Sequence, residues 1–121
     1  MSILDACNIC TRIALLISGP CTIGPGQIVG LPLGETMRTF IDINENNNNN
    51  RHQKAARKFY DGIEARLSQK HTLDIWAFGL DQYGLVEMKD MAAKSGGIIA
   101  MHELFSHFIF DSSFTMHYGA N

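Results

Sequence analysis

The sequence predicts an α/β fold built around a parallel β-sheet. Three short apolar runs, at 12–18, 73–79 and 97–101, do not alternate polar with apolar residues and are bounded by glycine or proline. Continuous apolar runs of this length are typical of strands that are buried on both faces, as in a parallel sheet. Segments with helical periodicity lie between the runs, so the order strand, helix, strand, helix, strand indicates an α/β unit with right-handed crossovers.

The first helical segment, 54–70, places its apolar residues on one face of a helix with 3.6 residues per turn. These residues are Ala56, Phe59, Tyr60, Ile63 and Leu67. The second segment, 82–94, repeats this spacing, with Asp81 placed to cap its start and Gly96 just beyond its end. A last helical turn or two is expected within 105–118.

A connection of 35 residues, at 19–53, interrupts this pattern. It is far longer than is usual between elements of a compact domain. It opens on glycine and proline turns and closes on an uninterrupted asparagine tract, Asn46 to Asn50. Because such a tract buries nothing apolar, residues 44–50 are predicted to form a solvated low-complexity insert.

The chain has 121 residues, which is room for one domain or a piece of one. Three parallel strands leave two sheet edges unprotected, one of them beside the chain start. We therefore expect residues 1–121 to be incomplete as a domain, with further strands supplied elsewhere in a longer chain or by a partner.

Composition excludes several classes of protein. Apolar residues make up 45% and charged residues 18%, which is ordinary for a globular core and excludes wholesale disorder. Ten Lys and Arg against twelve Asp and Glu give 10 − 12 = −2, so the chain offers no electrostatic case for binding nucleic acid. No apolar run approaches the roughly 18–20 residues of a membrane span. Three cysteines fit a reducing compartment better than a disulfide scaffold, so we expect a soluble intracellular chain.

Two motifs near the chain start imitate functional sites. GPGQIVG at 24–30 follows a strand, as phosphate-binding loops do, but the next helix begins some two dozen residues later and Pro25 removes one backbone donor. We interpret this loop as a chain of tight turns. Cys7 and Cys10 form a single C-x-x-C, and Cys21 alone does not complete a zinc site. The cysteines are therefore interpreted as buried or incidental.

Two further patterns imitate cation sites. The first begins at Asp42 and copies the early ligand positions of a calcium loop, but Asn47 stands where glycine is required. The second, D-x-S-x-T at 111–115, resembles a magnesium motif of adhesion domains, yet too little chain follows to supply further acidic ligands. Neither pattern is expected to hold a metal.

Basic residues concentrate in 51–70, where six Lys and Arg stand against Asp61 and Glu64, so the stretch carries 6 − 2 = +4. Three of the cations lie on the face opposite the apolar one: Lys54, Arg57 and Lys58. One interpretation is a solvated helix face in which Arg57 pairs with Asp61. The other is a contact for an acidic partner or for lipid headgroups.

Four stretches of the chain are specific enough to indicate a family. The most specific piece is LDQYGLVEMK at 80–89, which joins a strand end to a helix start without a gap. Together, over most of the chain, the four stretches resemble the trunk domain of the GTPase-activating subunit of the COPII vesicle coat. They are 12–30, 37–43, 56–67 and 71–97.

This resemblance implies a von Willebrand A-like fold. The chain would be the C-terminal half of that parallel (Rossmann-type) sheet with its flanking helices, and residues 1–121 would be a partial trunk domain. The D-x-S-x-T pattern at 111–115 would fall on the last helix instead of at the family's metal position. Asp111 departs from the family, which usually carries a lysine there.

The resemblance also implies a segment of a COPII inner-coat subunit that acts in transport from endoplasmic reticulum (ER) to Golgi. The family's trunk binds the coat's cargo-adaptor subunit and a Sar-type small GTPase, and the coat meets the cytosolic side of the ER membrane peripherally. Lys54, Arg57 and Lys58 are the residues expected to face a partner or the membrane. The arginine that stimulates GTP hydrolysis and the zinc-finger domain lie outside this chain, so neither catalysis nor a cofactor is expected in it.

Two alternatives remain open. The chain could be a small stand-alone α/β protein that binds a nucleotide or a metal, which would require a ligand at 24–30 or at Asp111. It could also be a truncated paralogue that binds the adaptor subunit without activating the GTPase. The sequence is compatible both with a fragment of a larger subunit and with a chain that ends at Asn121.

Overall fold

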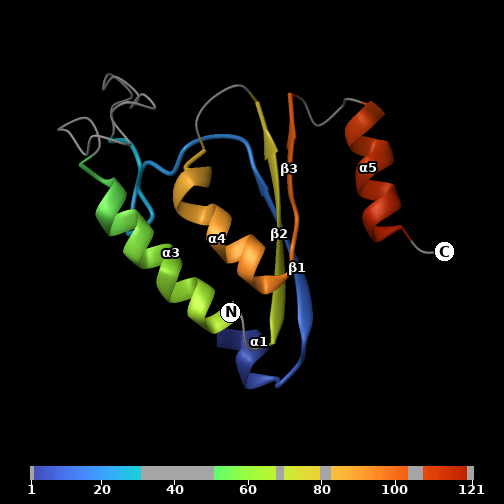
Figure 1. Cartoon of the computed structure of the whole chain (residues 1–121), viewed down its shortest axis with the longest axis horizontal. Coiled ribbons are helices and arrows are strands. Elements are labelled where there is room, and N and C mark those ends of the chain that lie inside the picture. Colours follow the sequence, from blue (N-terminus) through green and yellow to red (C-terminus); the bar gives the residue numbers. More distant parts are fainter. Residues whose placement is uncertain (1, 31–50, 68–69, 80–82, 104–107, 120–121) are drawn as a thin grey trace.

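The computed structural model describes residues 2–30, 51–67, 70–79, 83–103 and 108–119. Its helices and strands follow the predicted order (Figure 1), and the α/β prediction is confirmed. They are α1 (Ser2–Ala6), β1 (Thr11–Ile17), α3 (Gln53–Leu67), β2 (His71–Phe78), α4 (Leu85–Ser95), β3 (Ile99–His102) and α5 (Phe108–Tyr118). The sequence did not predict α1, and α5 runs for 11 residues, which is longer than the expected turn or two.

Two predictions fall outside the described residues. They are the asparagine insert at 44–50 and the calcium-like pattern that begins at Asp42.

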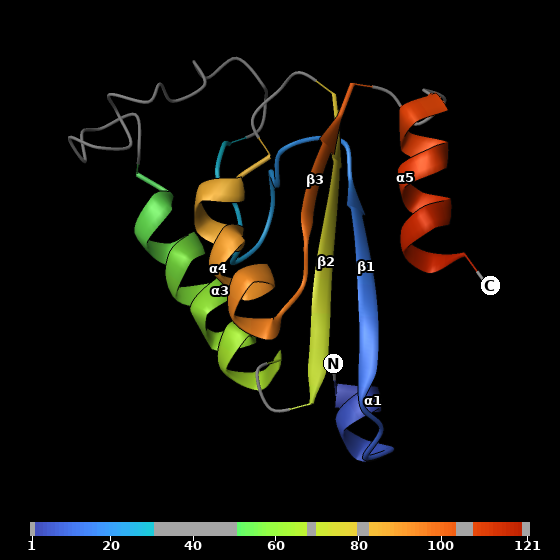
Figure 2. The same ribbon diagram turned by 45° about the vertical axis from the view of Figure 1, so that its right-hand side comes forward.

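The three described strands form a parallel sheet in the order β1-β2-β3. β1 pairs with β2 over seven residues, beginning with Thr11 opposite His71, and β3 pairs over four, beginning with Ile99 opposite Ile75. Figures 1 and 2 show α3 and α4 on one face of the sheet and α5 on the other. Because paired residues in a parallel sheet point to the same face, side chains in line with Ile75 face α3 and α4, whereas those in line with Trp76 face α5.

The main core lies between β2 and the helices α3 and α4. Its buried members are Leu67, Leu73, Ile75, Met88, Met91 and Ala92. Half-buried side chains of β1, such as Ile13 and Leu15, extend this cluster. Each fully buried aliphatic side chain contributes roughly 1.5–3 kcal/mol by leaving water, so this layer anchors both crossover helices to the sheet.

Of the described strands, β2 matches the prediction of burial on both faces. In β1 and β3, exposed and half-buried residues alternate, so the prediction is wrong for these two strands. The reason is that both lie at the edges of the sheet while the helices pack mainly on β2, which leaves Leu16 45% exposed and Met101 64% exposed. The two open edges expected from the sequence are therefore present among the described strands.

Two glycines set the ends of α4. Gly84 adopts a left-handed φ of 84° at the N-cap and offers no side-chain cap, so the helix begins at Leu85. The N-cap position predicted for Asp81, which itself lies outside the described residues, is held by Gly84, so the helix starts three residues later than the periodicity suggested. Gly96, with φ 78°, ends the helix as predicted, since its N–H and that of Gly97 bond back to carbonyls of the last turn.

Candidate interaction surfaces

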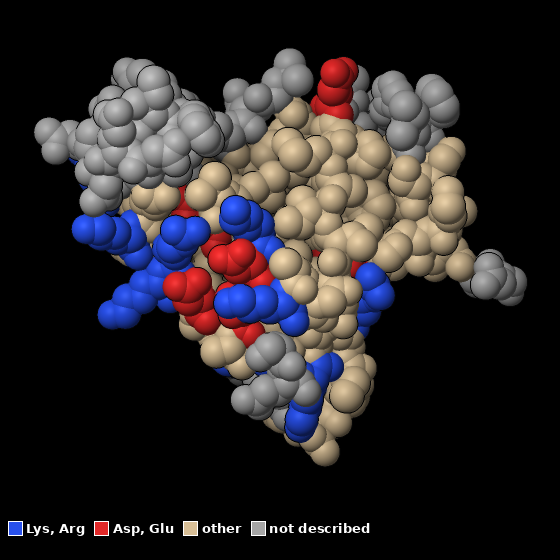
Figure 3. All heavy atoms as spheres, in the orientation of Figure 1, with Lys and Arg blue, Asp and Glu red and all other residues tan. Residues whose placement is uncertain are grey.

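The basic side chains expected to face a partner lie on the outer side of α3. Lys54, Arg57 and Lys58 are all exposed, whereas Ala56 of the same turn is fully buried. Figure 3 shows Lys and Arg gathered over this side of the molecule, with acidic side chains among them. The three cations have no ion-pair partner among the described residues. In the described part of the chain, no acidic side chain competes with a ligand of opposite charge for these three cations.

The acids on this side of the molecule are partly used within the fold. Glu64 of α3 pairs with Lys94 of α4, with Oε1 and Nζ 2.7 Å apart, and this hydrogen bond raises the pKa of Lys94 above its ordinary value. The predicted pair between Arg57 and Asp61 is not formed in the described part of the structure. Glu64 thus joins two helices instead of neutralising the outer side of α3.

Asp74 is a buried carboxylate in the middle of β2, with a side chain that is 0% exposed. Arg12 of β1 bonds it twice, from Nε to Oδ2 at 2.6 Å and from Nη2 to Oδ1 at 3.0 Å. From α5, the Tyr118 hydroxyl donates to Oδ2 at 2.5 Å and His117 Nε2 lies 3.2 Å from the same oxygen. The Ile98 backbone N–H donates to Oδ1 at 2.9 Å. The carboxylate therefore ties β1, the start of β3 and α5 to the central strand.

These contacts determine the ionisation of the carboxyl group. Burial alone would raise the pKa of Asp74, but the hydrogen bonds from Arg12, Tyr118, Ile98 and His117 outweigh it and hold that pKa well below its usual range. Burial and the bond to Asp74 also raise the pKa of Tyr118, which keeps the hydroxyl a donor. The network is therefore a charged acceptor surrounded by donors.

Aromatic rings complete the contact between α5 and the sheet. Trp76 is 1% exposed, and its Nε1 donates to the Tyr118 hydroxyl oxygen at 3.0 Å. The rings of Phe114 and Phe110 meet it edge-on, with centroids 5.2 and 5.8 Å away. His102 of β3 stacks nearly parallel to it at 5.9 Å. Ring packing and the Asp74 network together hold α5 against the sheet.

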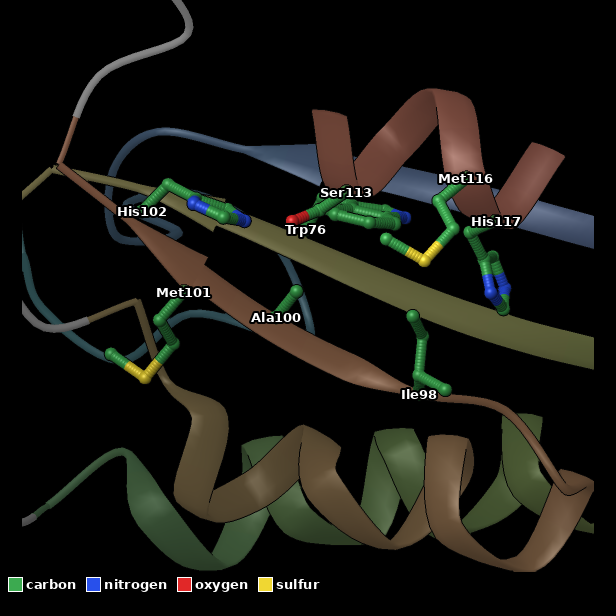
Figure 4. A pocket seen from close by; sticks show the side chains of 8 residues that line it. All are labelled: Trp76, Ile98, Ala100, Met101, His102, Ser113, Met116 and His117. Carbon is green, nitrogen blue, oxygen red and sulfur yellow. The ribbon is translucent and has the colours of Figure 1, made fainter. Parts of the chain in front are cut away.

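A groove of about 620 Å³ lies between β3 and α5 (Figure 4). Its lining residues are Trp76, Ile98, Ala100, Met101, His102, Ser113, Met116 and His117. Met116 of α5 is 84% exposed at its side, whereas Met101, which is 64% exposed, is in register with Ala77 and points to the other face of β3 (Figure 4). Nε2 of His102 is buried without a hydrogen-bond partner among the described residues. The groove is thus largely apolar, open to solvent and provided with an unsatisfied imidazole nitrogen.

The glycine-rich loop at 24–30 is a packing element. Gly24 turns the chain with φ 90°, and Ile28 is buried against Ala56 of α3. Tyr60 donates to the Gly26 carbonyl at 3.3 Å, and a Cβ at Gly26 would lie 2.5 Å from the Tyr60 hydroxyl oxygen. The interpretation as tight turns is confirmed. A phosphate loop needs a helix N-terminus directly behind it, whereas the next helix described is α3.

The remaining motifs form no metal centre in the described residues. Cys7 and Cys10 are free and exposed after the short α1, so of the two interpretations burial does not hold for them and incidental cysteines remain. The D-x-S-x-T segment at 111–115 lies within α5, as the resemblance implied, and alternate positions of a helix point to different sides. Within the described ranges, no group of three or more His, Cys, Asp or Glu side chains is placed to hold a metal ion.

Comparison with known proteins shows the family to which this fold belongs. The model of the Sec23/Sec24 trunk domain matches residues 1–118. The chain belongs to the Sec23/Sec24 trunk-domain family. It is also 40% identical over 104 residues to protein transport protein SEC23 F of Arabidopsis thaliana. That alignment covers 85% of this chain and 13% of the relative, so the chain spans a small part of the relative's length.

Membership of the Sec23/Sec24 trunk-domain family confirms the resemblance found in the sequence. The parallel sheet with helices on both faces is consistent with part of a von Willebrand A-like trunk domain. In the described part of this trunk segment, no helix has the length and apolar character needed to cross a bilayer.

Sequence reasoning missed the network around Asp74. One signal was present, since Asp74 interrupts the run 73–79 that was expected to be buried, and a buried charge requires a partner. The partners themselves could not be inferred, because Arg12 lies 62 residues away and Tyr118 lies 44 away. The register of β1 against β2 brings Arg12 to Asp74, and the packing of α5 on the sheet brings Tyr118 there.

Proposed function

We propose that this chain is a trunk segment of a COPII inner-coat subunit that acts in protein transport from the ER to the Golgi. The observation that carries the proposal is its 40% identity to a relative named as a protein transport protein, SEC23 F. The trunk-family match over residues 1–118 supports it, because the similarity extends over nearly the whole chain.

In this proposal the chain contributes recognition, and the arginine that activates the GTPase belongs to another part of the parent protein. Its partners are the cargo-adaptor subunit and the Sar-type small GTPase. The parent is cytoplasmic and reaches the ER membrane and coated vesicles peripherally, through the assembled coat. No cofactor is assigned to the chain itself. The exposed cations Lys54, Arg57 and Lys58 on α3, which have no ion-pair partner among the described residues, support a recognition surface for an acidic partner or lipid headgroups.

Immunoprecipitation from cell extract with an antibody against residues 71–97 tests this function. We expect the adaptor subunit to co-precipitate, and the antigen to move onto ER-derived vesicles when the GTPase carries a non-hydrolysable GTP analogue. Antigen that is found neither with the adaptor nor on these vesicles contradicts the proposal.

The size of the antigen on an immunoblot of the same extract shows whether the chain belongs to a larger parent protein that also carries GTPase activation. A band several times larger than 13.5 kDa would assign GTPase activation to the parent protein. A band at 13.5 kDa would leave recognition alone to this chain, as in the truncated-paralogue alternative.

A further inference from the structure

The outer edge of β3 is open among the described strands, because β3 pairs with β2 on one side only. The carbonyl oxygens of Ile98 and His102 accept hydrogen bonds from the β2 side at 2.8 and 2.9 Å. Backbone groups of successive strand residues point to opposite edges, so the N–H and C=O groups of Ile99 and Met101 point away from β2. This edge therefore offers two donors and two acceptors in the geometry that an added strand requires.

The β3–α5 groove adjoins this edge and can take side chains from such a strand. Its volume of about 620 Å³ lies within the ~300–1,000 Å³ range of ligand pockets. Ala100 lines it with a single methyl group, and Ile98 and Met116 supply apolar surface on either side. In Figure 4, Met116 extends from α5 toward β3 across this space. The buried Nε2 of His102 adds a polar position that a bound group can satisfy.

The charge distribution indicates the chemistry of the occupant. Among the described residues, the lining contains no Lys, Arg, Asp or Glu, and the imidazole of His117 is already bonded to Asp74. Figure 3 shows the cations and acids concentrated on the side of α3 and α4, while the surface over β3 and α5 is mostly uncharged. A charged occupant would lose its hydration here without gaining an ionic partner. An uncharged, apolar segment matches the surface.

We propose that the free edge of β3 and the β3–α5 groove form a docking site for an extended, uncharged peptide segment of a partner protein. The segment adds as a fourth strand beside β3 and places apolar side chains over Ala100 and against Met116. Backbone hydrogen bonds to Ile99 and Met101 supply affinity, and the groove selects the side chains. This site lies on the opposite side of the sheet from α3 and is independent of the coat assignment.

The fluorescence of Trp76 provides the readout, because it is the single tryptophan of the chain and lines the groove. The probe is the capped heptapeptide Thr-Val-Thr-Leu-Thr-Val-Thr, titrated into the 121-residue chain. We expect a saturable change in emission. Two matched peptides, one with aspartate in place of the central leucine and one with N-methylated backbone amides, should bind about tenfold more weakly or worse. No saturable change with the parent peptide overturns the proposal.

Variants of the chain then test the two parts of the site. Met101→Pro deletes an outward N–H and should weaken the peptide about fivefold or more, whereas Met101→Leu keeps the backbone and should bind within about twofold of the wild type. Ala100→Leu fills the groove and should also weaken binding, which keeps the test decisive if Met101→Pro unfolds by circular dichroism. Unchanged binding in Ala100→Leu overturns the proposal. Analytical sedimentation of the chain provides one more check. A dimer that Met101→Pro abolishes and that the peptide does not dissociate would also overturn the proposal, because the edge of β3 would then pair with a second copy of the chain.

Discussion

The side chain of Asp74 exchanges water for four hydrogen-bond partners, and this exchange fixes both its charge and the position of α5. Arg12 neutralises the carboxylate from β1, while Tyr118 bridges it to Trp76. Arg12 remains 45% exposed, so its half of the ion pair is weakened by solvent. The Tyr118 bond, in contrast, lies at the packed contact between the helix and the sheet.

Replacement of Asp74 by asparagine should therefore lower the free energy of unfolding by about 2–4 kcal/mol, since donors arranged for an anion lose their acceptor while Arg12 can turn to water. Tyr118→Phe removes one donor and the acceptor for Trp76, so its cost should be smaller, about 1–2 kcal/mol. Urea denaturation followed by circular dichroism measures both values. A loss below about 0.5 kcal/mol in Asp74→Asn would show that the network does not stabilise the fold.

Acid should remove the contribution of Asp74 to the free energy of unfolding. Its pKa in the folded protein is held below the unfolded value of about 3.9, so the unfolded state takes up the proton first as the pH falls. The stabilisation is complete above about pH 5 and is lost as the pH falls through the folded-state pKa. The difference in unfolding free energy between wild type and Asp74→Asn should therefore narrow between about pH 5 and pH 3. An equal difference at both pH values would rule out this titration.

Among the helices, strands and their connections, Gly97 and Gly62 differ most clearly in the space available for a side chain. A Cβ at Gly97, between α4 and β3, would lie 1.7 Å from the Leu73 carbonyl oxygen, so the chain passes β2 there without room for a side chain. Gly62 sits within α3 and has open space around its Cβ position.

We expect Gly97→Ala to destabilise the fold by more than about 2 kcal/mol, because the backbone must move, and Gly62→Ala to stabilise it by about 0.5–1 kcal/mol through helix propensity. Thermal unfolding of the two variants beside the wild type tests the pair. Similar melting temperatures for both would contradict the close approach of Gly97 to β2.

The same elements show what the sequence can predict. Runs of apolar residues predict the positions of the strands, and a 3.6-residue period predicts α3, because both patterns depend on which side chains are buried when the chain folds. The start of α4 was missed because it depends on the φ angle of one glycine, Gly84. The β3–α5 groove and the Asp74 network were missed because they combine residues from elements far apart in the chain. The exposure of the cations on α3 was predicted correctly, since an amphipathic helix has only one inner face.

At the scale of the whole molecule, charge and apolar surface are separated. Lys54, Arg57 and Lys58 occupy the side of α3 that faces away from the sheet, and the open edge of β3 with its groove lies beyond the other sheet face. Two surfaces of different chemistry can therefore be occupied at the same time.

The charged surface should respond to salt. In the proposed coat function, Arg57→Glu should weaken binding to the adaptor subunit or to phosphatidylserine vesicles about tenfold at low ionic strength, and the difference should shrink as salt is added. Lys89→Glu is a matched control, because Lys89 is an exposed cation on α4 and reversing it changes the net charge equally. Co-sedimentation with vesicles and pull-down with the adaptor distinguish the two ligands. An equal loss of binding affinity in Arg57→Glu and Lys89→Glu would show that the net charge of the chain, and not the surface of α3, determines binding.

The network at Asp74 has a consequence for how the chain opens. Arg12 and Tyr118 are 118 − 12 = 106 residues apart, yet both donate to the same carboxylate. Loss of either donor leaves the buried charge half-satisfied, which costs free energy. Strand β1 and helix α5 should therefore open together, and native-state hydrogen exchange should give their amides similar opening free energies. Protection of β1 that survives the opening of α5 would contradict this coupling.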